Sequence, residues 1–149
     1  MADLVTTISE SVVLNNSVRG SSNSITTTGI VDVYERILTC AHSQTTVAVQ
    51  FATTPYTEAG ALDVENTKYI RITNLSDAVE LEVAFVGTAT LYEVRVRALG
   101  SHILFNGDDI LKGEEDTTPA FGITEELVTI QVRPIGTTDA QVEVFVGLV

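Results

Sequence analysis

The feature that most constrains the fold of this chain is an alternation of apolar and polar residues with a period of two. It is clearest in "VELEVAFVGTATLYEVRVR", residues 79–97, and it recurs along the chain. Such a period places apolar side chains on one face of a strand, whereas a helix needs a period near 3.6. Nine segments have strand character: 4–14, 25–39, 45–53, 68–74, 79–86, 90–98, 102–106, 125–133 and 140–148.

The composition agrees with this pattern, because Val and Thr are the most frequent residues and Trp is absent. Side chains branched at Cβ suit a pleated, half-buried surface better than a helix. One strand after an N-terminal segment and seven more give eight, which favours an all-β, two-sheet sandwich of the jelly-roll type. Other sandwich topologies stay open, since strand order cannot be read from a single sequence.

The segment 79–97 predicts a hairpin with Thr88 and Ala89 as its two loop residues. Paired residues then have numbers that add to 177. Opposite charges across strands stabilise a hairpin and penalise slipped registers. Since Thr-Ala lacks the Asn-Gly signature of a two-residue turn, a longer loop is the alternative. The predicted pairs are Glu82 with Arg95, Glu80 with Arg97, Val83 with Val94, Leu81 with Val96 and Phe85 with Tyr92.

The N-terminal part predicts an arm separate from the main body. Residues 15–24, "NNSVRGSSNS", are polar and rich in turn formers, so we interpret them as a flexible link. The expected division is an arm and link over residues 1–24 and a sandwich over 25–149. Apolar residues on the arm need a surface to bury them, which suggests assembly with a neighbouring subunit or a shell. They are Leu4, Val5, Ile8, Val12 and Val13.

The charge balance narrows the range of partners. A net charge of −12, with eight Lys and Arg residues against 20 Asp and Glu, argues against a nucleic-acid partner. No apolar run approaches the roughly 18 residues of a membrane span. The start, "MADLVTTISES", lacks the basic and apolar regions of a signal peptide, so we expect synthesis in a cytoplasm. Cys40 is the single cysteine, and its apolar neighbours predict a buried, inert thiol.

Motifs of catalysis are not recognisable, so we expect a non-enzymatic protein without a cofactor or a metal. His42 and His102 cannot supply a three-histidine metal site, and Ser101 and His102 are adjacent, so they point to opposite faces of a strand. The acidic stretch 107–124 is the longest non-strand segment, and loops of that length are often functional. A partner-docking or cation-binding loop there would use Asp108, Asp109, Glu114, Glu115 and Asp116.

Two segments, "KYIRITNLSDAVELEVAF" (68–85) and "TIQVRPIGTTDAQVEVFVGLV" (129–149), resemble small β-sandwich structural proteins of marine tailed-phage virions. The resemblance covers about the second half of the chain and rests on the style of the sequence. It implies a head decoration (cement) protein or another minor virion component, located in the virion and assembled as a homotrimer on the major capsid protein. It supplies no functional residues that could be assigned to positions of this chain. Two alternatives remain: a receptor- or glycan-binding module that uses the acidic loop, and an enzyme of jelly-roll type.

Overall fold

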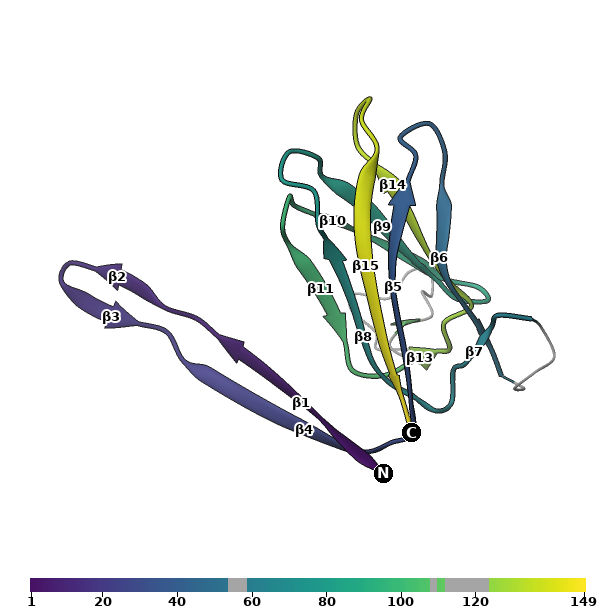
Figure 1. The fold of residues 1–149 in the computed structure, drawn as a ribbon, viewed down its shortest axis with the longest axis horizontal. Helices are drawn as coiled ribbons and strands as arrows, with labels where there is room; N and C mark the ends of the chain where they lie inside the picture. The colour runs from purple at the N-terminus through teal and green to yellow at the C-terminus, as the bar shows by residue number, and fades with distance from the viewer. Residues whose placement is uncertain (54–58, 108–109, 112–123) are drawn as a thin grey trace, which may run out of the picture.

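The computed structural model describes residues 1–53, 59–107, 110–111 and 124–149, and these contain strands and no helix (Figure 1). Two sheets form a body, from which a long hairpin projects. The prediction of an all-β, two-sheet sandwich is therefore confirmed. No helix among the described residues is long and apolar enough to cross a membrane.

The body consists of a five-stranded and a four-stranded sheet. The first has the order β10-β9-β14-β6-β7 and the second the order β11-β8-β15-β5. Along the chain, successive strands of the two sheets alternate between them, except that β7 follows β6 and β10 follows β9 within the five-stranded sheet. Their bounds are β5 Asp32–Cys40, β6 Thr46–Ala52, β7 Leu62–Asp63, β8 Thr67–Asn74, β9 Leu81–Val86, β10 Leu91–Val96, β11 Ser101–Leu104, β14 Thr129–Pro134 and β15 Ala140–Leu148, with the short β12 Ile110–Leu111 pairing β13 Thr124–Glu125 outside the two sheets.

The core lies between the two sheets and is made of the side chains that point inward from each of them. From Ile70 to Asn74 in β8 and from Ala140 to Val146 in β15 every second residue is buried, as the alternation in the sequence requires. The largest buried side chains include Phe85, Ile70, Ile72, Leu81 and Ile130. Each such side chain contributes about 1.5–3 kcal/mol by leaving water, so this layer holds the sheets together.

The register predicted for the hairpin of residues 79–97 is confirmed. Each described partner pair of β9 and β10 adds to 177, from Leu81–Val96 to Val86–Leu91. The N–H of Gly87 donates to the carbonyl of Thr90 at 2.8 Å, which leaves Thr88 and Ala89 as the loop. Phe85 and Tyr92 stack with their ring centroids 4.8 Å apart.

The ion pairs on this hairpin differ from the prediction. Arg133 of β14 donates two hydrogen bonds to Glu82, and Arg95 approaches Glu80 at 3.6 Å. Arg95 and Glu82 remain opposite each other in the register. The third strand, β14, lies on the other side of β9 and brings a guanidinium closer to Glu82 than Arg95 does.

The N-terminal region also differs from the prediction. β1 (Ala2–Ser9) pairs with β4 (Ser22–Ile30), and β2 (Val12–Leu14) pairs with β3 (Ser17–Arg19). Residues 15–24 therefore belong to a hairpin and not to a flexible link. The predicted strand 25–39 is two strands, because the chain leaves the arm at Ile30 and enters the body at Asp32. The boundary expected between residues 24 and 25 falls within β4.

We expect the stacked Phe85 to carry a large share of the stability of the hairpin. Phe85 is 0% exposed, so Phe85→Ala leaves a cavity and lowers the free energy of unfolding by about 3–5 kcal/mol. Leu91→Ala is the control, since Leu91 is 57% exposed on the same hairpin and its loss should stay within about 0.5 kcal/mol. Urea unfolding with an unchanged slope measures both; equal losses would contradict the packing described.

Candidate functional site: the hairpin arm

The arm is a two-stranded ribbon closed by a tight turn at Asn15 and Asn16. Both residues have positive φ, 51° and 62°, as the two loop residues of a type I′ turn do. Asn tolerates this region better than most residues, because its short side chain bonds locally. The turn joins Leu14 to Ser17, and the ribbon then runs back to the body (Figure 1).

Residues paired across the ribbon share a face, so its register defines two surfaces. One face carries Leu4, Ile8 and Ile25, which are opposite Thr27, Asn23 and Thr6. We call Leu4, Ile8 and Ile25 the apolar face of the arm. The other face carries Val5 and otherwise hydroxyl groups, and Thr7 and Ser24 are hydrogen-bonded across it at 2.8 Å. The ribbon thus presents chemically different surfaces on its two sides.

The root of the arm is packed on the body. Atoms of Leu4 and Ile30 lie 3.4 and 3.5 Å from the position that a Cβ would take at Gly147. The N–H of Val31 donates to the carbonyl of Leu148 at 2.9 Å. A Cβ at Gly147 would meet these side chains at ordinary van der Waals distance, so the root of the ribbon lies directly against the sheet.

Four of the five residues predicted for assembly are exposed on the arm. The exposed fractions are 60% for Val5, 44% for Ile8, 56% for Val12 and 68% for Val13, whereas Leu4 is half-buried at the root. Three further apolar residues of the arm are exposed and were not among the predicted ones: Leu14 (53%), Val18 (73%) and Ile25 (52%). The alternation of "VVLNNSVR" around an Asn-Asn pair is the signal that would have placed Leu14 and Val18 on a hairpin.

The outer face of the four-stranded sheet lies beside the root of the arm. Its first row across the strands is Val33, Gly147 and Tyr69, and its second is Glu35, Phe145, Arg71 and Ile103. The ring of Tyr69 meets those of Phe105 and Phe145 edge to face, at 5.7 and 5.9 Å. Arg71 forms an ion pair with Glu143 at 2.6 Å. This face is therefore apolar and aromatic next to the arm.

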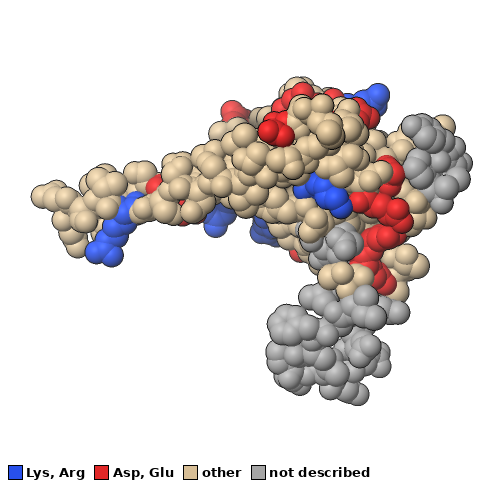
Figure 2. Space-filling model, turned by 90° about the horizontal axis from the view of Figure 1, so that it is seen from below, with Lys and Arg blue, Asp and Glu red and all other residues tan. Residues whose placement is uncertain are grey.

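Charge separates the arm from the body. Residues 1–30 contain only Asp3, Glu10 and Arg19 as charged side chains, so eleven of the twelve net negative charges lie in residues 31–149. Figure 2 shows the projecting arm as almost wholly uncharged, with acidic side chains gathered on the body. Contacts made by the arm therefore have to come mainly from shape and apolar burial.

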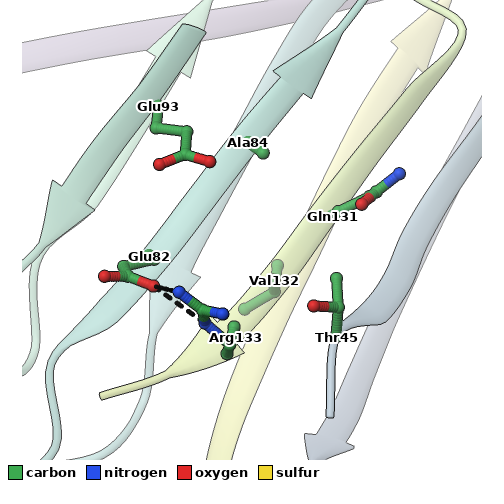
Figure 3. A pocket seen from close by; sticks show the side chains of 7 residues that line it. All are labelled: Thr45, Glu82, Ala84, Glu93, Gln131, Val132 and Arg133. Carbon is green, nitrogen blue, oxygen red and sulfur yellow. Dashed lines mark hydrogen bonds and ion pairs between the residues drawn. The ribbon is translucent and has the colours of Figure 1, made fainter. Parts of the chain in front are cut away.

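A shallow pocket of about 100 Å³ lies on the outer face of the five-stranded sheet (Figure 3). Its lining is mostly polar, with Glu82, Glu93, Gln131 and Arg133 on strands β9, β10 and β14. The hydrogen bonds from Arg133 to Glu82 close one side of it and raise the pKa of that guanidinium. The arrangement is that of a surface ion pair, which leaves little room for a ligand.

Histidine and cysteine occupy separate environments. Asp139 accepts a hydrogen bond from the backbone N–H of His42 at 3.0 Å and pairs with its Nδ1 at 2.8 Å, and these contacts lower the pKa of Asp139. Cys40 is buried as predicted, and burial raises the pKa of its thiol. Ser101 bonds to Thr73, while His102 contacts Phe85 on the other side of the strand. Within the described ranges no three His, Cys, Asp or Glu residues gather to hold a metal ion.

The acidic segment predicted as a docking or cation loop lies outside the described residues. This applies to Asp108, Asp109, Glu114, Glu115 and Asp116. Its flank is described: the Glu125 carboxylate accepts hydrogen bonds from the N–H groups of Ala89 and Thr90 at 3.2 and 3.1 Å. Glu125 thereby caps the turn between β9 and β10.

Comparisons with models of known protein families, with curated proteins and with solved structures found no match to this chain.

His102 should make the stability of the protein depend on pH. Burial lowers the pKa of His102 below its ordinary value of 6.5, so the unfolded chain binds the proton more readily. The stability it confers is complete above that ordinary value and is lost as the pH falls towards the lowered pKa. We expect His102→Phe to flatten the decline of the unfolding free energy between about pH 7 and about pH 5. His42→Gln is the control and should keep the decline.

Gly20 should be needed for the continuity of the ribbon. Its φ is 129°, and a Cβ there would collide with the carbonyl oxygen of Glu10, whose N–H donates to the carbonyl of Ser21. We expect Gly20→Ala to speed amide hydrogen exchange at Glu10 and in β2 and β3. In the control Gly29→Ala, nothing lies within 4 Å, so only the cost of the positive φ, about 1–2 kcal/mol, remains. Unchanged protection of these amides in Gly20→Ala would contradict the close approach of Gly20 to Glu10.

Proposed function

We propose that this chain is a non-enzymatic structural protein of a tailed-phage virion, a decoration (cement) component that stabilises the capsid. It acts as a homotrimer, and its arm makes contacts with the major capsid protein. The observation that carries the proposal is the projecting arm, which exposes apolar side chains on a ribbon that is almost free of charge.

The physical support for an assembly role is that such an arm is unfavourable on an isolated chain. A hairpin of two strands is marginally stable in water, and exposed apolar residues on strands promote association. A chain with a net charge of −12 is otherwise built to stay apart from its neighbours. An arm of this kind is therefore explained most simply by a protein surface on which it is buried in the assembled state.

The resemblance of residues 68–85 and 129–149 to virion structural proteins is the reason for placing this assembly in a virion. The alternative, a receptor- or glycan-binding module, depended on the acidic segment 107–124. Most of that segment lies outside the described residues. The arm thus carries the proposal, and the virion is the place where it should be tested.

The test measures the copy number of the chain in purified virions of the phage that encodes it. We expect a copy number comparable with that of the major capsid protein, determined by quantitative mass spectrometry. Val18→Asp should reduce this occupancy at least tenfold, because it places a charge at the most exposed valine of the arm. Ser17→Asp is the control at the same tip and should retain occupancy. Absence from virions, or a few copies only, would refute the decoration role.

A further inference from the structure

The root of the arm and the neighbouring sheet form the two walls of a wedge. One wall is the arm, whose Leu4 lies against Gly147, and the other is the outer face of the four-stranded sheet. Grooves of about 270 and 590 Å³ open on either side of the root. Tyr69, Arg71 and Phe145 line the first with β1, and Phe105 lines the second with Ile25.

Both walls have apolar groups that their own chain leaves uncovered. Of the three residues of the apolar face of the arm only Leu4 is packed on the body, whereas Ile8 and Ile25 are 44% and 52% exposed. On the sheet the edge strand β5 exposes Val33 (44%) and Ile37 (61%). The root is fixed to the body by Leu4 and by the bond from Val31 to Leu148, and beyond it the arm extends away from its own sheet (Figure 1).

The charge distribution favours a second copy of this chain as the occupant. Two acidic bodies repel each other, but residues 4–9 and 22–30 of the arm contain no charged side chain. The acceptor face is also nearly neutral, since Arg71 is paired with Glu143 and Glu35 is the further charge on its first two rows. An uncharged ribbon can thus reach an acidic neighbour at little electrostatic cost.

We propose that the apolar face of the arm of one copy packs on the outer face of the four-stranded sheet of a second copy. Ile8 and Ile25 lie against Val33, Ile37 and the aromatic cluster of Tyr69, Phe105 and Phe145. Sheets stack about 10 Å apart, a distance that side chains of this size fill. The inference rests on the proposed function only in taking the arm as an element of assembly.

The experiment is a complementation test with purified full-length chains. Chain X carries Ile8→Asp and Ile25→Asp, and chain Y carries Val33→Asp and Ile37→Asp. Light scattering after gel filtration should find the unaltered protein oligomeric and X and Y each monomeric. A mixture of X and Y should form a heterodimer, because Y supplies an intact arm and X an intact acceptor. Different affinity tags on X and Y identify it.

Matched controls test whether charge alone disrupts the assembly. Ser22→Asp lies on the hydroxyl-rich face of the same ribbon, and Val47→Asp lies on the other sheet, where Val47 is 52% exposed. Both should leave the oligomer intact. Circular dichroism of X and Y should match that of the unaltered chain, because all four altered side chains lie outside the core.

Several results would overturn the inference: an unaltered chain that is monomeric, variants X and Y that remain oligomeric, or a mixture that stays monomeric. The outcome is separate from that of the proposed function. Complementation by a chain that is absent from virions would support the arm exchange and refute decoration. Abundant virion incorporation of a chain whose variants fail to complement would support decoration and refute the exchange.

Discussion

The shared apolar layer between the two sheets is the constraint on which the rest of the structure depends. Because strand side chains alternate, each strand that buries one face must expose the other, so the layer fixes which residues reach the surface. Two polar residues are fully buried in the described part of the chain, Thr67 and Asn74. Asn74 donates to the carbonyls of Val79 and Arg97 and accepts from the N–H of Ser76. These bonds tie the end of β8 to the start of β9 and the end of β10, and leaving them unmade would cost about 1–3 kcal/mol for each buried group.

The β9–β10 hairpin could be predicted because its information is local. Alternation gives the faces, and a two-residue loop gives the register. The partner of Glu82 could not be predicted in the same way, because Arg133 is 51 positions away in sequence and reaches Glu82 only when β14 pairs with β9. Local pattern therefore determines which residues are opposite each other. Strand order decides which charged side chains form ion pairs, and that order cannot be read from a single sequence.

The arm was misjudged for a related reason. A ribbon and a sandwich strand have the same period, so "SITTTGI" and "VDVYERIL" read as one strand although β4 pairs with β1 and β5 with β15. The positive φ of Asn15 and Asn16 is what turns a polar stretch into a hairpin. What distinguishes arm from body in the sequence is charge and not periodicity: the arm has hydroxyl groups where body strands carry Glu and Arg.

This difference in charge matters because electrostatic repulsion and apolar burial act over different distances. Repulsion between acidic bodies acts over the Debye length, about 8 Å at physiological ionic strength, whereas apolar burial acts only at contact. A ribbon of thirteen residues from Ala2 to Leu14 spans about 40 Å at roughly 3.3 Å per residue, several times that length. An arm this long and this weakly charged can make apolar contacts while the acidic bodies stay beyond the range of their repulsion. The acidic bodies therefore prevent indiscriminate association, and the nearly uncharged arms confine association to a defined face.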